Sequence, residues 1–337
     1  MRRSSYFAVT CQIGFLVLFA GQLLAVSCYP TGFSRYGIPL KAALINPTAP
    51  VSGDLDATGC DIGVYYNAGR GAVQHATIHG ALWFGVVVNG DTNAVAVDIT
   101  DSSIYQIGDS PFNGVQRGIA IYYRAFLTGS TSGTISGNRV WNYQKGGIVT
   151  NGLGTRVAIS DNHVLGLGPV DFIAQNGIQV GYGASASVMR NQVVGNSYTG
   201  TSTVSGGIVA VGGPGYGTCP DGNPCPYTVG TQIVGNTVSN NDVGIFLTNI
   251  AADGFSAPTT ATNIKAVNNL ISSDGLYNDY GGFGYQAGVS DVGNNDKIIH
   301  NTITGAGYDP AAFPSAYVVA IDADPSFTNR PKVHANR

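Results

Sequence analysis

The six residues Ile-Ser-Gly-Asn-Arg-Val at positions 135–140 decide the fold, because their pattern returns along the chain. The pattern is an apolar residue, two spacers, an Asn, one spacer and a second apolar residue. Further copies occupy 159–164, 188–193, 233–238, 266–271 and 298–303. The asparagines at the fixed place are Asn138, Asn162, Asn191, Asn236, Asn269 and Asn301. Such repetition indicates a stack of similar structural units.

A second pattern, Gly followed by Ile, alternates with the first. It begins at Gly118, Gly147, Gly177 and Gly207, so its copies are about 30 residues apart. A coil of short strands with inward apolar residues, an inward Asn at one turn and Gly at a tight corner cannot bury its apolar face alone. We therefore predict an all-β chain, folded as a single-stranded right-handed parallel β-helix of about eight coils. The six asparagines would form a ladder between coils. A β-sandwich also has many short strands, but it rarely repeats in this way.

The composition agrees with a turn-rich β protein. The 337 residues include 48 Gly, and all 19 acidic residues are Asp. Glu and Lys, which usually cover exposed helical faces, are absent or scarce. The net charge of −3 and the lack of a basic stripe argue against nucleic acid as a partner.

The N-terminus has the pattern of a signal peptide over residues 1–27, with Arg2 and Arg3, an apolar run and small residues before Cys28. We expect a lead-in and cap over 28–59, the β-helix over 60–321, and a C-terminal cap and tail over 322–337. The protein would be secreted, or held in the cell envelope. Residues 24–28 also resemble a bacterial lipobox. A lipid on Cys28 is the one route by which we expect membrane attachment.

The cysteines predict at least one disulfide. Cys219 and Cys225 flank a turn-rich stretch, and they would pair in an oxidising compartment. Cys28 and Cys60 would pair if Cys28 carries no lipid. No metal site and no cofactor is predicted, although calcium is left open. The Asx-rich stretch 291–296 lacks a recognised calcium-loop spacing, so we expect a solvated turn there.

Residues 60–305 resemble the right-handed parallel β-helix repeat proteins, which are related in fold to pectate lyases. The resemblance rests on Tyr-Gln-Lys-Gly-Gly-Ile at 143–148, on Ile-Ala-Gln-Asn-Gly-Ile-Gln-Val at 173–180, and on the Asn turns. It is strongest to a group of bacterial secreted proteins that mostly have no assigned activity. The resemblance therefore implies a fold rather than a reaction.

Two sets of side chains are candidates for a site. Outward residues beside the ladder should meet on adjacent coils, and these are Arg139, Asp161, His163 and Arg190. In β-helix polysaccharide lyases an Arg or Lys removes the proton α to a uronate carboxylate, so Arg139 or Arg190 would be the base. Ion pairs between coils explain the same residues without chemistry. Three insertions supply the aromatic candidates for sugar stacking, which are Tyr216, Tyr227, Tyr277, Tyr280 and Tyr285. These rings would otherwise cover the flank of the helix.

The first functional hypothesis is a non-catalytic secreted or surface-attached protein that binds polysaccharide or has a structural role. The alternative is a polysaccharide lyase, or another carbohydrate-active enzyme, that acts on an acidic polysaccharide. A buried Arg or Lys in a groove with clustered acids would favour the enzyme, whereas isolated solvated ion pairs would favour the scaffold. A phage-type receptor-binding rod is a third interpretation, which the signal peptide disfavours.

Overall fold

The computed structural model describes residues 26–337, and almost all of its regular structure is β-strand. The strands are β1 (Tyr29–Arg35), β2 (Ile38–Ile45), β3 (Val51–Asp56), β4 (Ile62–Tyr66), β5 (Gly69–His79), β6 (Phe84–Asn89), β7 (Ala94–Thr100), β8 (Ser103–Ile107), β9 (Ile119–Arg124), β10 (Ser130–Ser136), β11 (Arg139–Tyr143), β12 (Gly146–Asn151), β13 (Thr155–Ser160), β14 (His163–Val170), β15 (Asn176–Gly181), β16 (Ser185–Met189), β17 (Gln192–Tyr198), β18 (Gly206–Gly212), β19 (Gln232–Val234), β20 (Thr237–Ser239), β21 (Val243–Asn249), β22 (Lys265–Val267), β23 (Leu270–Ser272), β24 (Tyr285–Val292), β25 (Lys297–Ile299), β26 (Thr302–Thr304), β27 (Tyr317–Asp322) and β28 (Lys332–His334). Three short 3-10 helices are η1 (Pro214–Tyr216), η2 (Tyr280–Gly282) and η3 (Ala306–Tyr308). The predicted leader lies outside the described residues, apart from its last two positions.

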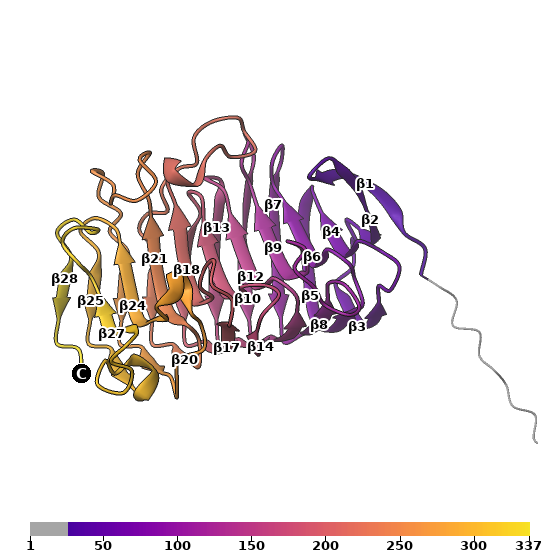
Figure 1. The fold of residues 1–337 in the computed structure, drawn as a ribbon. Helices are drawn as coiled ribbons and strands as arrows, with labels where there is room; N and C mark the ends of the chain where they lie inside the picture. The colour runs from indigo at the N-terminus through magenta and orange to yellow at the C-terminus, as the bar shows by residue number, and fades with distance from the viewer. Residues whose placement is uncertain (1–25) are drawn as a thin grey trace, which may run out of the picture.

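The strands form two long sheets that stack coil upon coil into a rod (Figure 1). Sheet A has eleven strands in the order β1-β2-β4-β6-β9-β12-β15-β18-β21-β24-β27, and all but β1 run parallel to their neighbours. Sheet B has 17 strands and forms the other faces of each coil. The predicted right-handed parallel β-helix is therefore confirmed.

In-register stacking builds the core of the rod. Ile148 of β12 lies opposite Ile178 of β15, which lies opposite Ile208 of β18, and all three are fully buried. The Gly before each Ile is required by close packing, because a Cβ on Gly147 would lie 2.6 Å from the carbonyl oxygen of Gly177. The Gly-Ile pattern thus marks the core position of β12, β15 and β18, whereas in β9 the residue opposite Ile148 is Ile121, two positions after the Ile of the pattern.

The six asparagines of the repeat are buried at the turns before β11, β14, β17, β20, β23 and β26. Each Nδ2 donates to the Oδ1 of the next Asn at 2.9–3.0 Å, and the chain of hydrogen bonds ends on Asn336. Each Nδ2 also donates to a strand carbonyl, as that of Asn191 does to Ile159 at 3.0 Å. These bonds satisfy backbone groups that the turn would otherwise bury without partners.

Coil stacking extends beyond the expected limits of 60 and 321. Strand β2 pairs in parallel with β4, and β3 pairs in parallel with β5. At the other end β28 pairs with β25. The first of these coils lacks the Asn motif, and the last carries only part of it, from Val333 to Asn336.

Two disulfides fix the lead-in and one loop. Cys219 pairs with Cys225, with Cα atoms 4.9 Å apart, as predicted. Cys28 pairs with Cys60, with Cα atoms 5.5 Å apart, so the sulfur that a lipobox would use is bonded to another cysteine. Within residues 26–337 no helix has the length and apolar character needed to cross a membrane.

Candidate functional site

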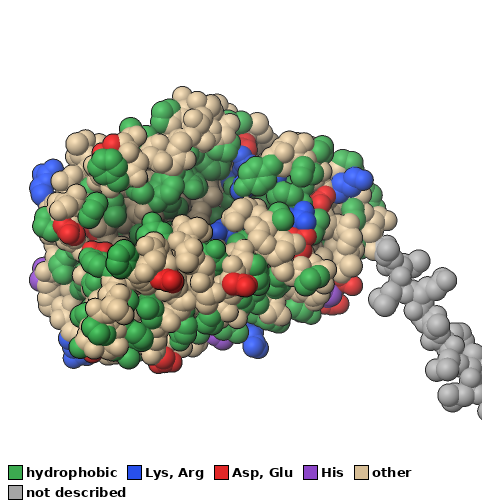
Figure 2. All heavy atoms as spheres, viewed as in Figure 1, with side chains coloured by type: hydrophobic (Ala, Val, Ile, Leu, Met, Phe, Trp, Pro, Cys, Tyr) green, Lys and Arg blue, Asp and Glu red, His purple; other side chains and the backbone are tan. Residues whose placement is uncertain are grey.

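A cleft runs along the outer face of sheet A, and it consists of cavities that share walls. Near the N-terminal coils lie two adjoining cavities of about 390 and about 200 Å³. Tyr216 lines the larger of these and also a third cavity of about 480 Å³ over β21 and β24. Figure 2 shows this face hollowed, with hydrophobic side chains in the hollow and Lys or Arg side chains toward one end. A groove of this shape suits an extended ligand.

The floor of the cleft is one register row of sheet A, which we call the outer row. From coil to coil it consists of Tyr122, Val149, Gln179, Val209, Phe246, Ser290 and Asp322. These side chains face outward because the residues before them in β12 and β15, Ile148 and Ile178, fill the core. The row changes from aromatic through apolar to acidic, so different parts of a long ligand would meet different chemistry.

Two cationic side chains, Arg35 and Lys145, line the smaller N-terminal cavity. Arg35 stands at the tip of the β1–β2 hairpin, with its guanidinium carbon 5.8 Å from the ring centroid of Tyr122. Among residues 26–337, neither cation forms a salt bridge. The nearby Arg124 differs, since it contacts the carboxylate of Asp91 at 2.7 Å. The smaller cavity therefore presents two cationic side chains and no acidic side chain among its lining residues.

Lys145 lies in the turn between β11 and β12, and its Nζ donates a hydrogen bond to the carbonyl oxygen of Ala174. Burial lowers the pKa of Lys145 to about 8, because desolvation disfavours the ammonium form. Near neutral pH this side chain can bind an anion as a cation or accept a proton as an amine. Lys145 is not among the site residues predicted from the sequence, although the scarcity of Lys in the chain was a usable signal.

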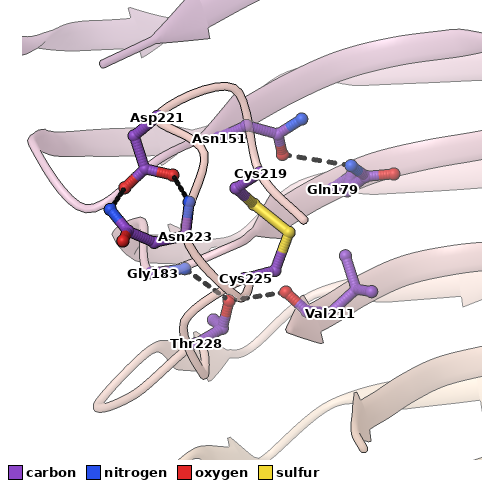
Figure 3. Close-up of a disulfide and its surroundings, with 9 residues drawn as sticks. All are labelled: Asn151, Gln179, Gly183, Val211, Cys219, Asp221, Asn223, Cys225 and Thr228. Carbon is purple, nitrogen blue, oxygen red and sulfur yellow. Dashed lines mark hydrogen bonds between the residues drawn. A yellow bond between two sulfur atoms is a disulfide. The ribbon is translucent and has the colours of Figure 1, made fainter. Parts of the chain in front are cut away.

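Three amide side chains line the same cavity in a hydrogen-bonded chain. Asn176 Nδ2 donates to Gln179 Oε1, and Gln179 Nε2 donates to Asn151 Oδ1, both at 3.1 Å. Figure 3 shows the second bond beside the loop that Cys219 and Cys225 close. Each amide nitrogen carries a second hydrogen, so this chain can donate to hydroxyl groups of a ligand.

The predicted tyrosines divide into two groups. Tyr216, Tyr280 and Tyr285 line the third cavity. Tyr227 and Tyr277 are half-buried and line none of the cavities described above. Three tyrosines that the sequence analysis did not select line the N-terminal end, namely Tyr36, Tyr122 and Tyr182. They lie outside the insertions, so only the stacking of coils reveals them.

The four residues predicted as a catalytic cluster lie together, but outside this cleft. Arg190 holds Asp161 through two hydrogen bonds, Nε to Oδ1 at 2.8 Å and Nη2 to Oδ2 at 2.7 Å. Arg139 lies in register with His163, and its guanidinium carbon lies 4.9 Å from the ring centroid of Trp141. The hydrogen bonds from Arg190 lower the pKa of Asp161. Both partners of this pair are exposed, which matches the solvated pair expected of a scaffold.

The Asx-rich stretch 291–296 was expected to be a solvated turn, and this expectation is wrong, because its two carboxylates are buried. Asp291 is 2% exposed and Asp296 is fully buried. Strand β24 turns Asp291 inward, opposite the core residue Leu247 of β21. Burial and the neighbouring Asp296 carboxylate raise the pKa of Asp291. Alternation along β24 places Asp291 inside, and the turn before β25 places Asp296 inside. The spacing of the Asx residues in the sequence does not show which of them are buried.

No family model and no curated protein matches the chain. Among solved structures it is similar to DFA-IIIase from Arthrobacter chlorophenolicus A6 without its lid, at 11% identity and a TM-score of 0.43, covering 86% of this chain and 65% of that one. It is also similar to the Dettilon tailspike protein, at 15% identity and a TM-score of 0.38, covering 88% of this chain and 63% of that one. A third is bacteriophage CBA120 tailspike protein 3, at 13% identity and a TM-score of 0.32, covering 87% and 55%. The chain thus spans less than two thirds of each, and its assignment to the right-handed parallel β-helix fold rests on its own strand pairing.

Proposed function

We propose that the protein binds an extended acidic polysaccharide in the cleft over sheet A. The observation that carries the proposal is the pair of cations, Arg35 and Lys145, which line one cavity without an acidic partner among the described residues. A carboxylate of a uronic acid is the counter-ion that would fit between them. The predicted leader and the two disulfides support an extracellular or envelope setting, where such polymers occur.

The surroundings of the two cations support a sugar rather than an isolated anion. Asn176, Gln179 and Asn151 can donate to hydroxyl groups, and Tyr182 adds an aromatic surface to the same cavity. The cleft continues past Tyr216 to the C-terminal coils, so several sugar residues can lie along it.

Binding is tested by calorimetry with oligosaccharides of matched length, one series of uronic acids and one of neutral hexoses. We expect the acidic series to bind and Lys145→Met to weaken that binding about tenfold, the value of one charge-assisted hydrogen bond. Arg139→Met is the matched control, because Arg139 is a cation outside the cleft. Equal binding of both series, or equal effects of the two substitutions, would contradict the proposal.

A second candidate function is β-elimination, and the lowered pKa of Lys145 is the observation that favours it. The neutral amine would take the proton at C5 of a bound uronate, a C4–C5 double bond would form, and the C4–O4 bond would break. The leaving oxygen would take a proton from water. New absorbance from the unsaturated product, lost in Lys145→Met, would establish this activity. Binding without such absorbance would leave the non-catalytic function.

A further inference from the structure

In the last coils of the rod, two buried carboxylates replace aliphatic core side chains of the preceding coil. Leu247 of β21 lies opposite Asp291 of β24. Because Lys265 lies opposite Lys297, the residues before them, Ile264 and Asp296, also share a register position. Leu247 and Ile264 both belong to the core and are fully buried. The next coil therefore puts two acidic groups where the preceding coil has Leu and Ile.

One oxygen of each carboxylate is firmly held. Thr328 Oγ1 donates to Asp291 Oδ2 at 2.9 Å. Thr262 Oγ1 donates to Asp296 Oδ1 at 2.6 Å, and the backbone N–H of Ile264 donates to the same oxygen at 2.7 Å. These bonds fix the orientation of both carboxylates without supplying a positive charge.

The other oxygen of each carboxylate is buried and accepts no hydrogen bond from any third residue among 26–337, and the two carboxylates lie within hydrogen-bonding reach of each other. These oxygens, Asp291 Oδ1 and Asp296 Oδ2, face the same side of Gly293, where a Cβ would collide with both. In the same turn Asn294, which is 1% exposed, has a third buried oxygen without a partner, its Oδ1. Among the described residues, no Lys, Arg or His forms a salt bridge with either carboxylate. Buried unpaired carboxylates are costly unless a cation joins them.

We propose that Asp291 and Asp296 bind a calcium ion inside the C-terminal end of the rod. The ligands are hard oxygen atoms, which calcium prefers, and two carboxylates balance its charge. Asn294 Oδ1 lies in the same turn and is a further oxygen donor. Since Thr328 belongs to the segment after β27, the ion would fasten the last coil to the coils before it. This site is separate from the cations of the cleft and does not depend on the proposed function.

The test uses the double variant Asp291→Leu/Asp296→Ile, which gives the coil of β24 and β25 the same residues as the matching positions of the preceding coil. Each protein is unfolded, freed of metal with EDTA, and refolded with CaCl2 or with EDTA. We expect wild-type protein to retain about one calcium per chain. Its unfolding midpoint should be about 5 °C higher in CaCl2, as for a ligand near 100 times its Kd. The double variant should retain no calcium and should show no shift. The preceding coil buries Leu and Ile at these two positions, so this variant should fold.

The controls separate this site from surface binding. Asp161→Asn removes an exposed carboxylate and should keep the whole calcium response. If the double variant does not fold, Asp296→Asn takes its place as the test. This substitution preserves the shape of the side chain and should abolish calcium binding. The same midpoint for wild-type protein in CaCl2 and in EDTA, with no calcium retained, would overturn the proposal and indicate carboxylates that share a proton. A calcium response that persists in the folded double variant would overturn it as well.

Discussion

The asparagine ladder and the outer row of sheet A are built by the same coil geometry, yet they differ in how their residues change. Every rung of the ladder is Asn, and its partner is the Asn of the next coil. The outer row changes at almost every step, from Tyr122 through Gln179 and Phe246 to Asp322. A constant row satisfies groups within the protein and so holds the coils together. The polar side chains of the variable row bond to neighbours outside the row, as Gln179 does to Asn176 and Asn151, and they line cavities that are open to a ligand.

Removing a central rung should have the largest effect on stability. Asn191 Oδ1 accepts from the backbone and side chain of Asn162, and its Nδ2 donates to Ile159 and Asn236. Asn191→Ala leaves several of these buried groups without partners, at about 1–3 kcal/mol for each. We expect a loss of about 3 kcal/mol or more in the free energy of unfolding, measured by urea denaturation followed by circular dichroism. Ligand binding by the protein that remains folded should not change.

Asn336 provides the matched control for the ladder. It accepts from Asn301 at 2.9 and 3.0 Å, but it is only half-buried. Water can therefore replace its side chain in Asn336→Ala, and the loss should be below about 1 kcal/mol. If the two substitutions cost the same, the ladder does not depend on burial and the comparison fails.

The same contrast explains what could be predicted from the sequence. The fold, the six asparagines and the Cys219–Cys225 disulfide followed from repeated or local patterns. The cleft could not be predicted in this way, because the residue after each Gly-Ile pair differs from coil to coil, as Gln179 does from Val149, and because Tyr122 and Lys145 approach it only when the coils stack. The loops that form its walls also differ in length from coil to coil.

The second prediction concerns pH and tests whether the variable row binds or reacts. Lys145 has a pKa of about 8, and the other titratable groups of its cavity are Arg35, Tyr36 and Tyr182. Arg35 stays charged, and the pKa of Tyr182 is raised to about 12, so Lys145 is the group of this cavity that changes charge near pH 8. Affinity for uronic-acid oligomers should therefore fall about tenfold as the pH rises through 8.

β-Elimination would show the opposite pH dependence, with activity that rises where affinity falls. The base must be the neutral amine, so product absorbance would increase as the pH rises through 8. Lys145→Arg is the control, because it keeps a positive charge at every pH tested. That variant should bind without a pH step near 8. If the affinity of the wild-type protein does not change between pH 6 and pH 9, Lys145 does not contribute to ligand binding.

The smallest effect is expected on the face that carries Asp161 and Arg190. Their hydrogen bonds at 2.7 and 2.8 Å link two coils, as the ladder does, but both side chains are exposed. Water solvates either partner when the other is removed, and the charge interaction is screened by salt. Asp161→Asn should therefore leave the unfolding midpoint in urea unchanged within error at 150 mM salt, and should leave binding unchanged. A clear loss of ligand binding in this variant, with the fold intact, would mean that ligand binding is not confined to the cleft. The surface beside the ladder would then also contact ligand.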